Sequence, residues 1–210
     1  MFSRLVYGAR NTIGIAVIAT FIAFFVGGFF GLIAATLGGW VDQVLSRIID
    51  VLMAIPSLIF ALLLLTIFGT NIFNLIIVIS LLDSTRVFRL TRAVAMNVVV
   101  MDFVEAANVR GEGLLWVIRR EILPNIIAPL VAEFGLRFCF VFLTISALSF
   151  LGLGIQPPMA DWGSMVRHNA PLITFGDITP LLPAGAIAIL TISVNSIVDW
   201  VLNRSSGFNE

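Results

Sequence analysis

No charged residue occurs between Arg10 and Asp42, and a second uncharged run extends from Val51 to Leu82. The apolar core of a bilayer is about 30 Å thick, and a helix needs roughly 20 residues to cross it. Of the 210 residues, 60% are hydrophobic and only 11% are charged, and a soluble domain of this size could not bury such a surplus. We therefore expect an all-α membrane protein, organised as one transmembrane domain over residues 1–210.

The uncharged runs divide into membrane spans. In the first run, Gly27 and Gly31 form a G-x-x-x-G spacing, which permits close packing of helices. The second run would be about 48 Å long as one helix, so we divide it at the turn-like Gly69–Asn71 and expect a kink at Pro56. The five predicted spans are residues 12–37, 48–68, 72–91, 126–150 and 181–202.

The arginines predict an orientation. All twelve basic residues are arginine, and membrane proteins keep an excess of basic residues in their cytoplasmic loops. With the loop at 101–124 inside and the Gly- and Pro-rich loop at 151–180 outside, eight arginines are cytoplasmic and three are external. The C-terminus is then cytoplasmic and the N-terminus external.

The absence of lysine excludes several chemistries. A phosphate-binding P-loop needs a lysine on the β- and γ-phosphates, and Schiff-base catalysis needs a lysine amine. One cysteine and one histidine do not make a disulfide framework or an ordinary zinc site. The balance of twelve acidic and twelve basic residues gives no indication of a nucleic-acid partner.

The cytoplasmic loop is expected to form a helical knob outside the bilayer. Asp102 is predicted to cap a first short helix, with Glu105 reaching back to the cap in a capping box. Gly111 ends this helix and allows a reversal. A second short amphipathic helix with Trp116 follows, and Pro124 suits the first turn of the next membrane helix.

This loop carries a resemblance. Glu105-Ala106-Ala107, then Gly111 and Ile122-Leu123-Pro124, resembles the EAA loop of ABC-importer permeases, although Glu121 stands where the family usually has isoleucine. In that family the loop is a coupling helix that fits a cleft on the cytoplasmic ATPase. The docking residues that the resemblance implies are Glu105, Ala106, Ala107, Gly111, Leu114, Trp116, Ile122, Leu123 and Pro124.

A second motif is similar to the outer loop of dipeptide, oligopeptide and nickel permeases of the C type. It runs from Leu148 to Pro158 and continues in Asp161-Trp162-Gly163-Ser164-Met165. The resemblance covers nearly the whole chain and implies a type I ABC importer permease core (MetI-like), with five transmembrane helices and a cytoplasmic coupling helix. Family members usually carry one more membrane helix before this core, which accounts for the expected external N-terminus.

The resemblance also implies partners. They are a second homologous permease, two cytoplasmic ATPase subunits that bind ATP and magnesium, and an extracytoplasmic solute-binding protein. This chain would hold no cofactor or metal, perform no covalent chemistry and reside in the bacterial inner membrane. Di- or oligopeptides are the leading solutes, with nickel and other small solutes behind.

Charged residues within the spans are candidates for function because charge is costly at depth. Glu133 and Arg137 lie four residues apart on one helix face. They either line the translocation path or form a structural ion pair. Asn195 on the last span either lines that path or forms a hydrogen bond across helices. Asp83 and Arg86, three residues apart, are predicted to form a structural pair at a helix end.

Two other classes of function compete with an importer subunit. A secondary transporter or channel would use Glu133, Arg137 and Asp83 to couple ions. An intramembrane enzyme with a Ser–His dyad would need His168, which is the only histidine. His168 lies in the Pro-rich outer loop, and this position disfavours the enzyme class.

Overall fold

The computed structural model describes the backbone of residues 2–205 and the side chains of residues 2–201. This part of the chain is helical and contains no strand, which confirms the all-α prediction. The α-helices are α1 Phe2–Leu37, α2 Gly39–Met53, α3 Ser57–Phe68, α4 Ile72–Val99, α5 Asp102–Val109, α6 Leu114–Val117, α7 Leu123–Leu151, α8 Trp162–Asn169 and α9 Leu181–Ser205. A π-helical turn, η1 (Ile118–Ile122), and a 3₁₀ turn, η2 (Ala170–Phe175), complete the secondary structure.

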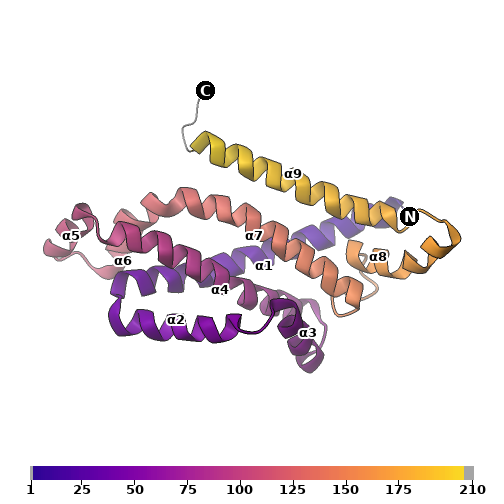
Figure 1. Ribbon diagram of the computed structural model, residues 1–210, viewed down its shortest axis with the longest axis horizontal. Helices are drawn as coiled ribbons and strands as arrows, with labels where there is room; N and C mark the ends of the chain where they lie inside the picture. Colours follow the sequence, from indigo (N-terminus) through magenta and orange to yellow (C-terminus); the bar gives the residue numbers. More distant parts are fainter. Residues whose placement is uncertain (1, 206–210) are drawn as a thin grey trace.

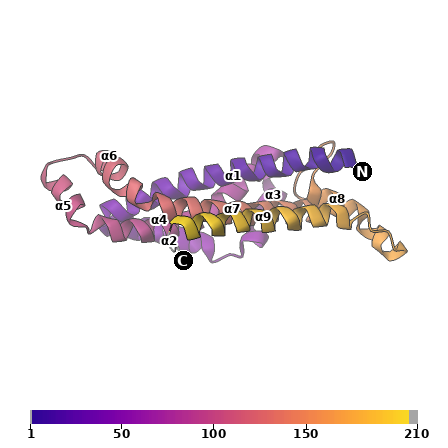
Figure 2. The same cartoon turned by 90° about the horizontal axis from the view of Figure 1, so that it is seen from above.

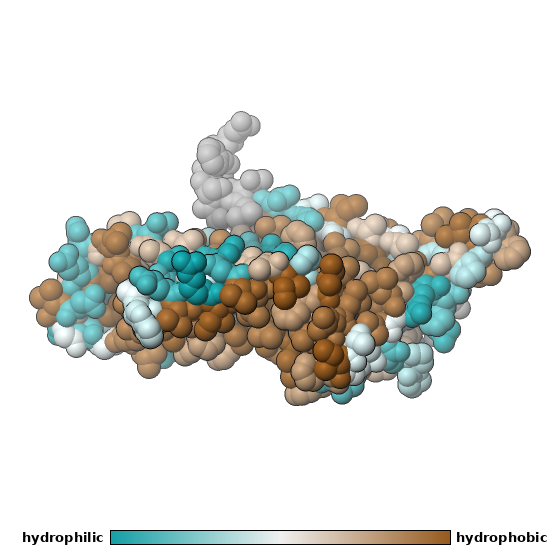
Figure 3. Space-filling model, turned by 60° about the horizontal axis from the view of Figure 1, so that its bottom comes forward, coloured by the Kyte–Doolittle hydropathy of each residue, from teal (hydrophilic) through white to brown (hydrophobic). Residues whose placement is uncertain are grey.

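The long helices α1, α4, α7 and α9 run along the long axis of the molecule (Figures 1 and 2). The loop with α5 and α6 lies at one end, and the N-terminus, α8 and η2 lie at the other (Figure 1). Hydrophobic residues cover the middle, whereas hydrophilic residues gather at both ends and in one cluster nearer the α5 end (Figure 3). This arrangement matches an apolar band with a polar region on each side.

The close approach predicted from the glycine spacing is confirmed. A Cβ added at Gly27 would collide with the carbonyl oxygen of Ser84, and one at Gly31 would lie 2.9 Å from the carbonyl oxygen of Phe88. Both partners are backbone atoms of α4, so α1 and α4 touch along these glycines. Ser80 strengthens the contact because its hydroxyl donates to the carbonyl of Ala19 at 3.0 Å.

The second uncharged run is divided where the sequence indicates, but the chain bends at Pro56 far more sharply than a kink. Helix α3 ends at Phe68, and Asn71 caps α4 by accepting a hydrogen bond from the amide of Asn74 at 2.7 Å. In place of a kinked helix at 48–68, α2 and α3 are separate helices bent by 84°. Pro56 explains the break, since it lacks an amide hydrogen and disfavours helix in the residue before it.

Within the described part of the chain, length and composition identify three helices that could cross a membrane: α1, the helical run from Leu114 to Leu151, and α9. The bent pair α2 and α3 would make a fourth if the two form one broken span. Helix α4, the remaining predicted span, carries Asp83 and three arginines along its length. The five-span topology stays a prediction.

The second amphipathic helix of the loop is not a separate element. Helices α6 and α7 join through η1 into one helical run, although Pro124 does lie in the first turn of α7, as predicted. A proline removes one amide donor from the helical ladder, and a π-turn is a usual way to accommodate such a defect. This corrects the predicted boundary.

Candidate functional site

The loop at 101–124 is held by a small apolar core of its own. Val104, Ala107, Val117 and Ile122 are almost fully buried, and they pack against residues from the adjacent ends of α1, α4 and α7. Those partners include Leu32, Ala35, Ala95 and Ile126. The loop is therefore fixed to the ends of three long helices and does not hang freely from them.

The exposed residues of this loop include Glu105 and several apolar side chains. Glu105 and Ala106 are exposed on α5. Val109 is 82% exposed and Leu115 72%, and Trp116 also reaches the surface. Exposed apolar residues at a polar end of a membrane protein are typical of a surface that a partner covers. We call this face, formed by Glu105, Ala106, Val109, Leu115 and Trp116, the knob surface.

The structure divides the predicted docking residues into two groups. Glu105, Ala106, Gly111, Trp116 and Pro124 are exposed. Ala107 and Ile122 are fully buried, and Leu114 and Leu123 are partly buried, so these four support the knob from within.

Gly111 occupies the position where the chain reverses. Its φ of +81° lies in the left-handed region, which glycine adopts without steric cost. A Cβ there would meet no atom within 4 Å, so the backbone conformation, not space, requires glycine. An ion pair between Arg110 and Glu121, at 3.9 Å, links the reversal to η1.

The predicted capping box is wrong. Met101 occupies the N-cap position of α5, and no side chain caps the helix. Asp102 and Glu105 instead lie within the first turn, where their negative charge still faces the positive end of the helix dipole. With no capping bond to hold it, the exposed carboxylate of Glu105 is available to a partner.

The charges within the long helices form one cluster that joins α4 to α7. Arg137 Nε lies 2.7 Å from Glu133 Oε1, and Arg137 Nη1 lies 3.8 Å from Asp83 Oδ1. All three side chains are at most 18% exposed, and the Arg137 guanidinium also lies 4.7 Å from the ring centre of Phe140. This favours the structural reading of Glu133 and Arg137, because Arg137 also reaches Asp83 and so joins α7 to α4 away from the surface.

The predicted pair of Asp83 and Arg86 is wrong. Asp83 turns to Arg137 on α7, and Arg86 forms no ion pair with any described residue. The third candidate for the path, Asn195, is half-buried on α9, and its Oδ1 has no hydrogen-bond partner among the described residues. The structure therefore joins Glu133 to Arg137 but brings Asn195 into no described contact with them.

Sequence reasoning missed a second set of ion pairs, between α2 and α4. Arg92 donates through Nε and Nη2 to both carboxylate oxygens of Asp42, and Arg89 Nη2 lies 2.6 Å from Asp50 Oδ1. Residues three apart in a helix share a face, so the spacing of Arg86, Arg89 and Arg92 was the available signal.

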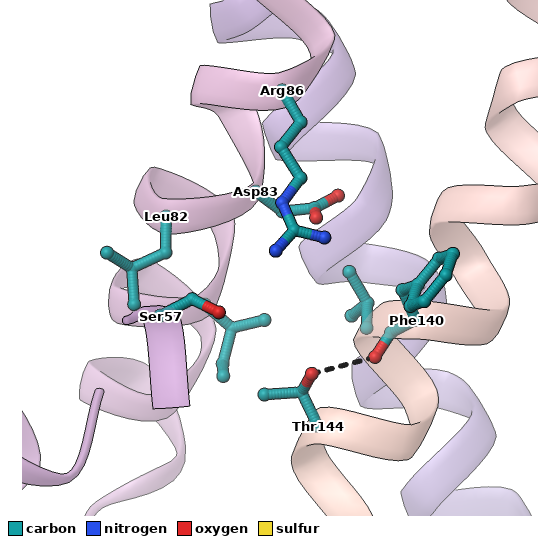
Figure 4. Close-up of a pocket in the computed structure, with 8 residues that line it drawn as sticks. Ser57, Leu82, Asp83, Arg86, Phe140 and Thr144 are labelled. Carbon is teal, nitrogen blue, oxygen red and sulfur yellow. Dashed lines mark hydrogen bonds between the residues drawn. The ribbon is translucent and has the colours of Figure 1, made fainter. Parts of the chain in front are cut away.

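A small cavity opens beside this face of α4, between α3 and α7 (Figure 4). Ser57, Asp83, Arg86 and Thr144 supply its polar lining, and Leu82 and Phe140 are among its apolar walls. Among the described residues there is no cluster of His, Cys, Asp and Glu that could hold a metal ion.

Comparison with known proteins agrees with this architecture. The family model for the binding-protein-dependent transport system inner membrane component matches residues 27–206. The chain is 34% identical over 199 residues to the dipeptide transport system permease protein DppC of Alkalihalophilus pseudofirmus, covering 95% of this chain and 66% of that protein. It is 32% identical, with the same coverage, to the di/tripeptide transport system permease protein DppC of Pseudomonas aeruginosa. The chain thus spans about two thirds of the length of these curated relatives.

Solved structures share the fold. An inward-facing structure of the methionine ABC transporter MetNI contains a chain that superimposes with a TM-score of 0.78 at 14% identity, over 97% of both chains. This chain thus has the helical fold of that transporter chain, and three or four of its described helices are long and apolar enough to cross a membrane. The chain belongs to the family of binding-protein-dependent transport system inner membrane components.

Proposed function

We propose that this chain is a permease subunit of an ATP-driven, binding-protein-dependent importer of di- or oligopeptides, and that it docks its ATPase through the knob surface. It would form half of the translocation path beside a second, homologous permease. Two cytoplasmic ATPases would bind and hydrolyse ATP with magnesium, and an extracytoplasmic binding protein would deliver the solute. The chain itself would carry out no catalysis.

The exposed Glu105 and Ala106, on a knob anchored to three long helices, are the observation that carries the docking proposal. A partner that moves the knob would also move the ends of α1, α4 and α7, because Val104 and Ile122 are packed among them. Closure of the ATPases could therefore tilt these helices and switch the path from inward-open to outward-open.

The names of the relatives support a peptide as the solute. Both curated relatives cited above are described as dipeptide or di/tripeptide permeases. The orientation rests on the arginines, eight of which are cytoplasmic in the five-span topology, as is the C-terminus. A protease-sensitive tag at the C-terminus should be cut in inside-out vesicles and protected in right-side-out ones, and the reverse result would overturn this topology.

The docking proposal predicts that Glu105→Arg and Gly111→Glu each reduce co-purification of the ATPase about tenfold or more. Glu105→Arg reverses a charge in the interface and Gly111→Glu adds one, so like charges meet or a charge is left unpaired. Gly111→Glu acts also through the backbone, because glutamate is strained at a φ of +81°. The measurement is the ratio of ATPase to permease after affinity purification of the tagged chain from detergent.

Asp177→Arg provides the matched control, because Asp177 is an exposed acid of the outer loop. It should leave the ratio of ATPase to permease unchanged. An unchanged ratio in both knob variants would overturn the docking role. Uptake that persists without ATP but collapses with the ion gradient would instead support an ion-coupled transporter built on Asp83, Glu133 and Arg137.

A further inference from the structure

Polar cavities follow one another along a single face of α4. The cavity of about 180 Å³ beside Asp83 and Arg86 is followed, toward the end of α4 near α5, by cavities of about 360 and 660 Å³ between α2 and α4. The last two share Asp50 and Arg92 in their linings, and Arg86 and Arg89 are one turn apart. We call this series of cavities the α4 groove.

Arg86 differs from the other arginines of this region. Arg89 and Arg92 face Asp50 and Asp42 on α2, and Arg137 faces Glu133. The exposed guanidinium of Arg86 has no carboxylate within ion-pair distance and donates no hydrogen bond within the described chain. A guanidinium offers five N–H donors in a planar fork, and this geometry matches a carboxylate.

The Arg86 side chain does not extend toward the nearer membrane interface. Arg86 lies 14 residues after Ile72, about 21 Å along α4 from its outer end in the predicted topology. In Figure 4 its guanidinium extends toward Ser57 and Thr144, and Thr144 lies beyond Phe140 toward the outer end of α7. Side chains on a helix tilt toward its N-terminus, so Arg86 points back into the span and away from the cytoplasmic end.

Charge balance is one role that the surroundings of Arg86 allow. Asp83, Glu133 and Arg137 sum to one negative charge, which Arg86 offsets from beyond ion-pair distance. A charged side chain at this depth should face water or a bound anion, and the groove offers space for both.

We propose that the α4 groove is this chain's share of the translocation path and that Arg86 binds the free carboxylate of the transported peptide. The inference rests on the proposed function and names the part of the solute that the permease recognises. In this proposal Glu133 and Arg137, which are buried in the α4–α7 contact, are not part of the path. The path instead follows the exposed face of α4 that carries Arg86.

The test compares two solutes that differ only at the carboxyl end: radiolabelled dialanine and its C-terminal amide. Binding to the purified transporter complex is measured by equilibrium dialysis without binding protein, and ATP-driven import is measured in proteoliposomes with binding protein. Wild-type complex should bind dialanine about ten- to a hundredfold more tightly than the amide, the usual worth of hydrogen bonds to a charged group. Arg86→Gln should remove this preference.

Two variants separate recognition from other effects. Arg10→Gln changes an exposed arginine of α1 that lies outside the groove, so the preference for the carboxylate should remain. Arg86→Lys keeps the charge near Asp83 but loses the fork, so the KM for import should rise while assembly stays intact. Full recovery of binding and import in Arg86→Lys would mean that Arg86 only balances charge, and would overturn the proposal.

The two readouts also separate this site from the proposed function. If the wild-type complex imports dialanine and Arg86→Gln keeps the carboxylate preference, the proposed site is wrong. The proposal of a peptide importer then still holds. Absence of dialanine import in the wild type overturns the peptide importer. A carboxylate preference in dialysis that Arg86→Gln abolishes and Arg10→Gln retains would still support the site for another anionic solute.

Discussion

Two of the helix interfaces that contain glycine in this protein present different atoms to it. At the α1–α4 interface, a Cβ on Gly27 would collide with backbone atoms of Ser84 and Phe88. At the α7–α9 interface, a Cβ on Gly135 would collide only with the side chain of Val198. The backbone of a packed helix cannot move aside, whereas a side chain can rotate or be shortened. The first glycine therefore sets the distance between two helices, and the second accommodates one methyl group.

Burial follows the same contrast. In the most apolar stretch of α1, 33% of the residues are buried, against 11% in α9. An apolar cavity of about 310 Å³ lies between α7 and α9, lined by Phe138 and Val198 among others. Helix α9 is therefore attached to the bundle from one side, and most of its surface is left for lipid or for a partner. Between the two glycine interfaces, α4 and α7 are joined by charge.

The largest effect is expected at this charged link. Arg137→Met removes the cation of both Asp83 and Glu133, and an unpaired buried charge costs about 3–5 kcal/mol of stability. Asp83→Asn should cost less, because Arg137 keeps Glu133 at 2.7 Å. Thermal unfolding of the detergent-solubilised complex, followed by size-exclusion chromatography, ranks the two. Equal costs would contradict a network centred on Arg137.

A somewhat smaller loss is expected for Gly27→Leu. Its side chain would press on the α4 backbone, so destabilisation should reach the upper end of the roughly 1–3 kcal/mol typical of overpacking. Gly28→Leu is the matched control, because a Cβ at Gly28 meets no atom within 4 Å. The same unfolding assay measures both. If the two variants melt together, the close α1–α4 contact does not depend on glycine.

The smallest effect is expected for Gly135→Ala. The added methyl group meets Val198, but alanine also favours helix by about 1 kcal/mol over glycine, so the two terms largely offset each other. Val198→Ala in the same chain should make room for the methyl group and bring stability above that of Val198→Ala alone. A double-mutant cycle measures this coupling. Absence of coupling would show that α9 does not depend on this contact.

Much of the fold could be predicted because the relevant signals are local. Uncharged runs located the apolar helices, and Gly69–Asn71 separated α3 from α4. The boundaries that failed depend on more than local composition. Helix α1 begins at Phe2, ten residues before the predicted span, because charged residues such as Arg4 and Arg10 end an apolar run without ending a helix. Pro56 indicated a kink, but only the packing around it decided on an 84° bend.

The candidate site could be predicted less completely. The motif located the loop and its exposed Glu105. It also predicted docking roles for Ala107 and Ile122, but the structure buries both residues inside the loop. Sequence spacing placed Asp83 beside Arg86 on one helix, but it could not register Arg137, which reaches Asp83 from a helix 54 positions away. A local spacing rule cannot foresee a competing partner that only the packing of α7 against α4 provides.

By itself the sequence determined that this chain belongs in a membrane, that it is helical and that it cannot hold ATP in a lysine-containing P-loop, because these follow from the amounts and types of residues present. It also determined the place of the knob, since a polar stretch between apolar helices has to leave the bilayer. The tertiary structure decided which side of each helix is used. Whether an arginine is a structural partner, like Arg137, or remains open to a solute, like Arg86, depends on which helix lies within reach of its guanidinium.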